Sequence, residues 1–224
     1  MDWSPLILTF QLAFITTVIL FFISIPLAYW LTHSRFRIKP AIEASISMPL
    51  VLPPTVLGFY FLLAFSPGNA FGQWLDEWLG IRLVFTFPGL VIASVIYSLP
   101  FMVQPIRSGL SGLSPSMIEA SYIMGKSKWT TLLKIELPNI KTSLLTGMVL
   151  TFAHTIGEFG VVLMIGGNIP NKTKVASIAI YDEVEALNYD TANQYSLILF
   201  VLTFAILLLV YIVNGSNFKY FGYD

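Results

Sequence analysis

An uncharged apolar stretch near the start of the chain restricts its possible folds more than any other feature. Residues 5–31 contain no Asp, Glu, Lys, Arg or His. At about 1.5 Å per residue, a helix over this stretch is longer than the roughly 30 Å hydrocarbon core of a bilayer. We therefore expect a transmembrane helix that is tilted or begins in the interface. The stretch lacks a basic leader and a cleavage site, so we read it as retained and not as a signal peptide.

Four more apolar segments follow. The composition is 56% hydrophobic and 11% charged, whereas soluble domains carry about 25% charged residues. These features predict an all-α integral membrane protein with five transmembrane helices, folded as a single domain over residues 1–224. The expected spans lie at about 5–31, 44–65, 83–106, 142–165 and 195–213, with a cytoplasmic loop at about 108–140 and a short surface helix within 175–187.

The basic residues are distributed unevenly between the two sides of this topology. Cytoplasmic loops of membrane proteins carry an excess of Lys and Arg. One side would hold nine of the twelve basic residues: Arg35, Arg37, Lys39, Arg107, Lys126, Lys128, Lys134, Lys141 and Lys219. This asymmetry predicts a multi-pass protein with the N-terminus outside and the C-terminus in the cytoplasm.

The polar loop has an internal design of its own. Ser114 and Pro115 fit the start of a helix, with serine as the cap and proline at the first position. Ser116 and Glu119 also fit a capping box one register later. Gly125 fits a helix end, where glycine adopts the left-handed conformation without steric cost. A second helix is expected over 127–136, stopped by Pro138.

Residues within 118–138, IEASYIMGKSKWTTLLKIELP, resemble the EAA motif of importer-type ABC transporter permeases. Only Ser121 departs from that motif, which usually has alanine there. The resemblance implies a coupling helix between spans three and four that sits in a groove of a separate ATPase. The residues that carry it are Glu119, Ala120, Ser121, Gly125, Ile135, Leu137 and Pro138.

The same loop also contains Gly125-Lys126-Ser127, which looks like the end of a phosphate-binding loop. The full pattern requires glycine where this chain has Ala120, so we do not expect nucleotide binding here. The chain is then a permease subunit and not an enzyme. It would carry no cofactor, because ATP and Mg would be bound by the partner ATPase.

Three further stretches resemble the molybdate and sulfate type of ABC permease, most nearly the molybdate type. They are MPLVLPPTVLG at 48–58, PFMV at 100–103, and GEFG at 157–160 followed by NIP at 168–170. The resemblance implies a type I importer permease of the MetI-like fold in a bacterial inner membrane. It also implies a homodimer with two ATPase subunits and an extracytoplasmic oxyanion-binding protein, and no nucleic acid. Molybdate is the substrate implied, with tungstate and sulfate left open.

The candidate pathway residues lie at two places where the spans contain unusual residues. Pro53 and Pro54, followed by Thr55, must break the second span. Irregular backbone at membrane depth is tolerated where it is buried in protein or lines a wet cavity. The break therefore either forms the pathway wall or is a packed kink.

The second place is in the fourth span, where His154 and Glu158 are four residues apart and would share one helix face. Gly157 and Gly160 flank the carboxylate. Such a pair could relay protons in a proton-coupled carrier, or it could be a structural or gating pair. The coupling motif favours the second reading. There is no cysteine, and the two histidines form no metal motif, so no metal site is expected.

Overall fold

The computed structural model describes residues 1–215, with side chains described up to residue 212. Lys219, counted above toward the cytoplasmic side, lies outside the described residues. Within residues 1–215 the chain contains helices and no strand, which confirms the all-α class. In chain order these are α1 (Ser4–His33), α2 (Lys39–Ser47), η1 (Met48–Leu50), α3 (Pro54–Phe65), α4 (Ala70–Leu79), α5 (Phe87–Ser111), α6 (Pro115–Ile123), α7 (Lys128–Thr131), the π-helical turn η2 (Leu132–Glu136), α8 (Leu137–Asn139), α9 (Lys141–Ile156), α10 (Gly160–Gly166), α11 (Ala176–Glu185) and α12 (Tyr189–Gly215).

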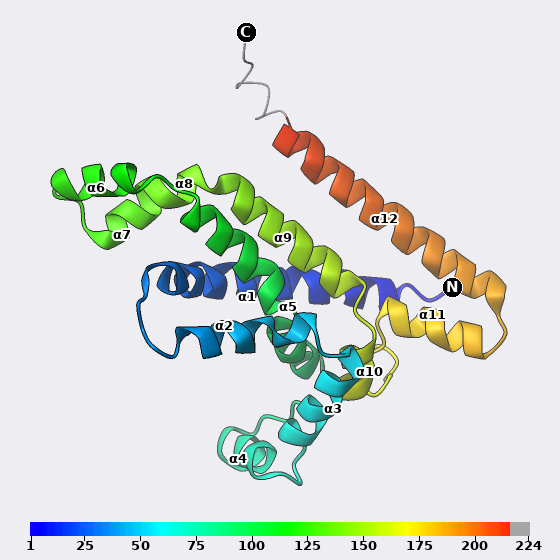
Figure 1. Cartoon of the computed structure of the whole chain (residues 1–224). Coiled ribbons are helices and arrows are strands. Elements are labelled where there is room, and N and C mark those ends of the chain that lie inside the picture. Colours follow the sequence, from blue (N-terminus) through cyan, green and yellow to red (C-terminus); the bar gives the residue numbers. More distant parts are fainter. Residues whose placement is uncertain (216–224) are drawn as a thin grey trace.

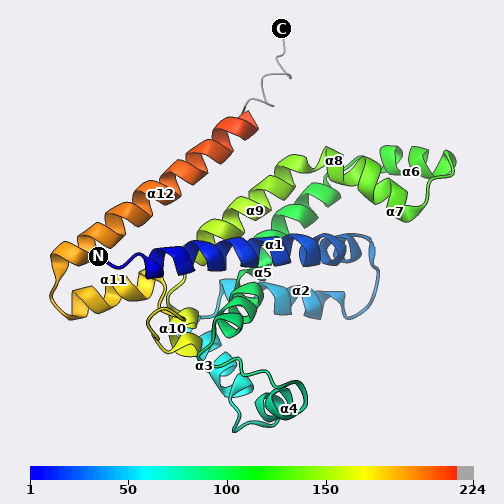
Figure 2. The same ribbon diagram turned by 180° about the vertical axis from the view of Figure 1, so that it is seen from behind.

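The centre of the molecule is a packed group of three long helices, α1, α5 and α9 (Figure 1). Two buried apolar clusters hold these helices and their neighbours together, one around Leu90 of α5 and Ile165 of α10 and one around Leu20 of α1 and Met102 of α5. The helices α6 and α7 project from one end of this group. At the opposite end, α12 reaches the body mainly through α11 and leans away from it, as the view from behind also shows (Figure 2).

Three helices are each long and apolar enough to cross a membrane: α1, α5 and α12. Two further pairs pass the same test together but are sharply bent. The chain turns by 111° between η1 and α3, and by 59° between α9 and α10. The described residues therefore hold three candidate spans, or five if each bent pair is one span. The count of five stays a prediction.

The double proline of the second apolar segment breaks the helix as expected, because α3 begins at Pro54. The fourth segment differs from the prediction of a continuous helix over 142–165. It divides at Gly157–Phe159, where Gly157 caps α9 and the chain redirects into α10. The sequence offered no proline there to indicate the break.

The third and fifth segments differ at their ends. α5 begins at Phe87, where the side chain of Thr86 accepts a hydrogen bond from the backbone N–H of Gly89 at 3.3 Å. It continues to Ser111, so Arg107 does not mark the helix end. Arg107 instead forms an ion pair with Glu43 of α2 at 2.9 Å. α12 begins at Tyr189, six residues before the expected start at 195.

Candidate functional site

The two bent helix pairs meet at their breaks. The first residue of α10, Gly160, lies against the first residues of α3: a Cβ at Gly160 would be 2.8 Å from Cβ of Pro54 and 3.2 Å from the backbone N of Thr55. On the other helix, a Cβ at Gly58 would be 3.0 Å from Cα of Val161. One glycine on each helix therefore permits the close packing of α3 on α10.

A cavity of about 450 Å³ lies beside this contact. The structure brings six of the seven predicted pathway residues together in its wall, with aromatic neighbours from α5 and from the break between α9 and α10. Pro53 precedes α3 and is not part of the wall. The lining residues are Pro54, Thr55, Tyr97, Ala153, His154, Gly157, Glu158, Phe159 and Gly160.

Glu158 is held from two helices. The Ser94 hydroxyl of α5 donates to Oε2 of Glu158 at 2.9 Å, and the Ser177 hydroxyl of α11 donates to its backbone oxygen at 2.7 Å. The side chain is 4% exposed, and its Oε1 has no hydrogen-bond partner. Glu158 thus ties the break between α9 and α10 to both α5 and α11.

His154 is held rigidly by a separate set of contacts. Its ring lies between Tyr97 and Phe101, with centroid distances of 4.8 Å and 3.9 Å. Its Nδ1 is 2.9 Å from the hydroxyl of Ser98, which is 3.2 Å from the hydroxyl of Thr155. Thr155 in turn donates to the backbone oxygen of Thr151 at 2.9 Å.

The direction of this chain of hydrogen bonds is set at its end. A carbonyl oxygen only accepts, so the Thr155 proton points to Thr151 and Thr155 must accept from Ser98. Ser98 has then used its one proton, so Nδ1 of His154 must be the donor. The chain of hydrogen bonds therefore places a proton on Nδ1 of His154.

His154 and Glu158 do not form the predicted pair on one helix face. α9 ends at Ile156, so the chain has left the helix before it reaches Glu158. Each side chain instead bonds to its own serine, Ser98 or Ser94, one turn apart on α5. The helix break therefore separates the pair that the spacing predicted.

The helical hairpin of α6 and α7 contains the EAA-like residues. α6 begins at Pro115 after Ser114, as predicted, but Ser114 bonds to the hydroxyl of Ser116 and caps no backbone N–H. The predicted turn at Gly125 is confirmed, with φ of 75°. The backbone N–H of Lys126 donates to the oxygen of Ser121 at 3.1 Å, which closes the end of α6.

Ser121, which departs from the motif, fastens the hairpin. Its buried hydroxyl lies 2.7 Å from the hydroxyl of Thr131 and so joins α6 to α7. Glu119 and Ala120 are exposed on the outer side of α6. Beyond them, the tip presents apolar side chains to solvent: Tyr122, Ile123, Met124 and Trp129, of which Ile123 is 87% exposed. An exposed apolar patch of this kind marks an interaction surface.

Pro138 does not stop the second helix, contrary to the prediction. The helical path runs from α7 through the π-helical turn η2 and into α8, where Pro138 occupies the first turn. Proline removes one donor and crowds the carbonyl four residues earlier, and the wider η2 turn directly precedes it. Ile135 and Leu137 are half-buried on either side of Glu136.

Glu136, the last residue of η2, is an unusual feature of this junction. Its side chain is 0% exposed and neither carboxyl oxygen has a hydrogen-bond partner. Burial raises the pKa of Glu136 above its ordinary value, and the nearby His33 at the end of α1 partly offsets this. The sequence offered no indication that this glutamate would be buried.

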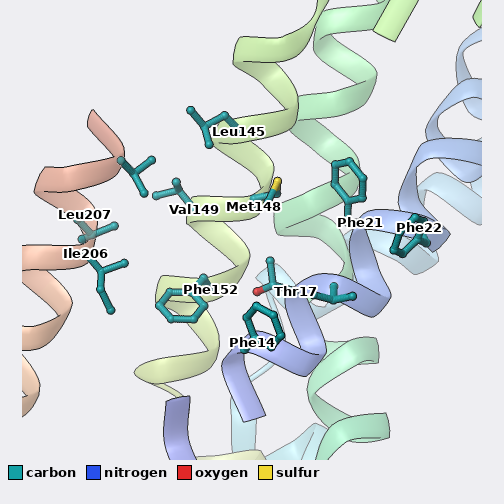
Figure 3. A pocket seen from close by; sticks show the side chains of 12 residues that line it. Phe14, Thr17, Phe21, Phe22, Leu145, Met148, Val149, Phe152, Ile206 and Leu207 are labelled. Carbon is teal, nitrogen blue, oxygen red and sulfur yellow. The ribbon is translucent and has the colours of Figure 1, made fainter. Parts of the chain in front are cut away.

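A second hollow, of about 250 Å³, lies between α1, α9 and α12 (Figure 3). Aromatic and aliphatic side chains line it, among them Phe14, Phe21 and Phe152, and Thr17 is its one polar member. It has no charged group to hold a polar ligand. Among the described residues, no group of three or more His, Cys, Asp or Glu side chains could hold a metal ion.

Several residues of these sites escaped the sequence reasoning. Ser94 and Ser98 looked like ordinary small residues of an apolar helix, although their spacing of four places them on one face. Ser177 lies in the predicted surface helix within 175–187, observed as α11, but no motif marks it. The apolar tip of the hairpin could have been found, because Ile123, Met124 and Trp129 interrupt a polar loop.

Comparison with known proteins gives consistent results at the level of sequence and fold. Residues 21–217 match the family model for the binding-protein-dependent transport system inner membrane component. The chain is 44% identical to the molybdenum transport system permease protein ModB of Azotobacter vinelandii, over 97% of this chain and 96% of the relative. It is 31% identical to the sulfate transport system permease protein CysT of Escherichia coli, over 93% of this chain and 74% of that protein.

Among solved structures, the chain resembles a bacterial ABC transporter involved in the import of the acidic polysaccharide alginate. The TM-score is 0.81 at 16% identity, over 95% of this chain and 78% of the other. At this identity the likeness shows the fold alone. The fold is that of an ABC importer permease.

Proposed function

The chain belongs to the family of binding-protein-dependent transport system inner membrane components, and on that premise we propose that it is the permease subunit of an ATP-driven molybdate importer. The observation that carries the substrate is the 44% identity, over nearly the full length of both chains, to a protein named for molybdenum transport. Tungstate has similar oxyanion chemistry, and the relative named for sulfate transport keeps sulfate as an alternative.

The proposed topology counts each bent pair as one span. Five spans then separate the termini, with the N-terminus outside and the C-terminus in the cytoplasm. This arrangement would put α6 and α7 in the cytoplasm. It is supported by the basic residues of that hairpin and its flanks, among them Lys126, Lys128 and Lys134.

The contact between α3 and α10 is the proposed gate of the pathway. Its support is the meeting of two broken helices beside a cavity that contains polar groups, as is common in transporters. Two copies of the chain would enclose the pathway between them. The described residues that line this cavity include no Lys or Arg, so the substrate would pass without being trapped.

The hairpin tip is the proposed contact with a separate ATPase subunit, of which the assembly would hold two. Support comes from its exposed apolar residues, which lie outside the expected spans, where lipid cannot cover them. The hydrogen bond between Ser121 and Thr131 and the turn at Gly125 would make the hairpin stiff enough to transmit movement. A separate oxyanion-binding protein outside the cell would deliver the substrate.

A proton-coupled carrier is the competing function, and the bonding of His154 speaks against it. A relay group passes its proton to another titratable group, whereas the hydrogen bonds from Nδ1 of His154 run through Ser98 and Thr155 and end at the backbone oxygen of Thr151. Glu158 has its own partner in Ser94. We therefore assign both residues a structural role at the gate.

Metal accumulation in a deletion strain tests the proposal. A strain lacking this chain should lose molybdenum accumulation and molybdoenzyme activity at trace molybdate, and high external molybdate should restore both. A plasmid copy of the chain is the control. Normal molybdenum content with a defect in sulfate or tungstate uptake would reassign the substrate and keep the mechanism, and an intact uptake of all three would refute the proposal.

A further inference from the structure

The helix α4 has an inward side, a polar side and an aromatic side, and its attachment to α3 fixes how they are oriented. A Cβ at Gly72 would lie 2.1 Å from the backbone oxygen of Ser66, so glycine allows α4 to rest directly on the end of α3. Gly80 ends the helix with φ of 63°, and its N–H donates to the oxygen of Asp76 at 3.1 Å. Leu75 packs inward on the core around Leu90.

The polar residues of α4 bond to one another. Nε2 of Gln73 donates to Oε1 of Glu77 at 2.7 Å, one turn along the helix. Nε of Arg82, just beyond the helix, lies 3.0 Å from both carboxyl oxygens of Asp76. This face is therefore polar and exposed, and its side chains bond to one another.

A third strip of the helix is aromatic and faces away from the rest of the molecule. Phe71, Trp74 and Trp78 recur at spacings of three and four, which places them on one side. They are 49%, 48% and 78% exposed, respectively. Aromatic rings of this size each have about 150–250 Å² to bury, so such a strip needs a covering.

A row of aromatic rings connects the strip to the end of α3, which is half of a bent candidate span. Ring centroids follow one another at about 6 Å: Phe61 to Phe65 at 6.0 Å, Phe65 to Phe71 at 6.0 Å, and Phe71 to Trp74 at 6.2 Å. Phe65 is 8% exposed and belongs to the apolar core around Leu90, so the row fixes α4 to the end of α3. Because α3 is half of a bent candidate span, α4 lies where that span ends.

We propose that α4 lies in the lipid–water interface, with Phe71, Trp74 and Trp78 inserted among the lipids and Gln73 and Glu77 in water. Tryptophan favours this depth, because its ring is apolar and its N–H can bond to headgroups. The helix also has the polar and apolar faces of an interfacial helix. In Figure 1, α4 projects from the body beyond α3, well away from the α6–α7 hairpin. The extracytoplasmic side of the membrane is assigned on the strength of the proposed function.

Spin labels on single cysteines test the proposal, since the chain has no cysteine of its own. The full-length chain would be reconstituted in vesicles of phosphatidylethanolamine and phosphatidylglycerol. Labels replace Trp74 and Trp78 on the strip, and Gln73 and Glu77 as matched neighbours on the polar face. Accessibility to oxygen, which concentrates in lipid, is compared with accessibility to a water-soluble nickel chelate.

Strip labels should favour oxygen and report a depth of about 5–10 Å below the phosphates, whereas the polar-face labels should favour nickel. Strip labels open to nickel would overturn the proposal. Low accessibility to both probes would indicate burial against a second copy, and would also overturn it. So would a strip that becomes immobile only when an extracytoplasmic binding protein is added.

The depth measurement does not depend on transport, so it can fail separately from the proposed function. A correct depth without molybdate uptake would leave α4 in the interface and reassign the protein. The side of the membrane is tested by an impermeant thiol reagent on intact cells carrying Glu77→Cys. Labelling is expected, and protection of this cysteine would overturn the extracytoplasmic assignment.

Discussion

Adding one methyl group at Gly160 should act directly on the proposed gate. In Gly160→Ala the new Cβ would stand 2.8 Å from Cβ of Pro54, whereas carbon atoms in favourable contact are about 3.5–4.0 Å apart. The proline ring and the backbone of Thr55 cannot rotate away, so α3 and α10 must separate by roughly 1 Å or accept the clash. Overpacking of this kind typically costs about 1–3 kcal/mol.

That cost changes the balance between the packed and separated arrangements by about 5- to 150-fold. Substrate uptake by Gly160→Ala should therefore fall at least about fivefold, while the protein inserts in the membrane in normal amount. Alanine's better helix propensity applies to helix interiors, and Gly160 is the first residue of α10, so it offsets little of the clash. The assay is uptake of the transported oxyanion at matched membrane expression.

Gly157→Ala is the matched control from the same tetrad. A Cβ there meets nothing closer than 3.7 Å, and the residue has an ordinary φ of −82°. Uptake by this variant should stay within about twofold of the wild type, as expected for a change of less than about 0.5 kcal/mol. Equal uptake by both variants would refute the close contact between α3 and α10 as the functional gate.

Three further predictions concern other parts of the chain. Gly125→Val should destabilise the turn by about 1–2 kcal/mol because φ at this position is positive, and it should weaken co-purification with the ATPase. Gly125→Asn should weaken it less, since asparagine tolerates this conformation. Equal ATPase binding by both variants would contradict the role of the turn. Burial raises the native pKa of Glu136 above its ordinary 4.5, so the native state binds more protons than the unfolded state between the two pKa values. Stability against thermal unfolding should therefore fall as the pH rises from 4.5 through the native pKa. Glu136→Gln should lack this decline. Uptake should resist an uncoupler at constant ATP, and loss of uptake with the uncoupler would restore the proton-relay hypothesis. Glu158→Gln should retain more uptake than Glu158→Ala, since an amide oxygen still accepts the hydrogen bond from Ser94.

Sequence reasoning succeeded where one residue type imposes its conformation on the backbone. The double proline ended a helix because two consecutive donors were missing, and Gly125 took the left-handed conformation that its position required. Both effects are local, so the chain alone specifies them.

The same reasoning failed where tertiary packing decides. The break at Gly157–Phe159 depends on Gly160 fitting against Pro54, which is about a hundred residues away in the chain. The serines that separate His154 from Glu158 belong to α5, and nothing near the pair in sequence points to them. The burial of Glu136 likewise depends on the end of α1. Whether the predicted coupling and pathway residues have those roles stays a prediction.

The position of α12 has a consequence for how the chain is made. Within one copy its surface is almost wholly uncovered, and it is joined to the body chiefly through α11. Its apolar length alone suffices for entry into the bilayer, so insertion need not wait for the earlier helices to pack. We expect the ribosome to release a chain whose α1, α5 and α9 are already assembled, with the last helix docking afterwards. A reporter fused after the final residue should therefore be tolerated, whereas one fused before α1, which packs on both α5 and α9, should impair assembly.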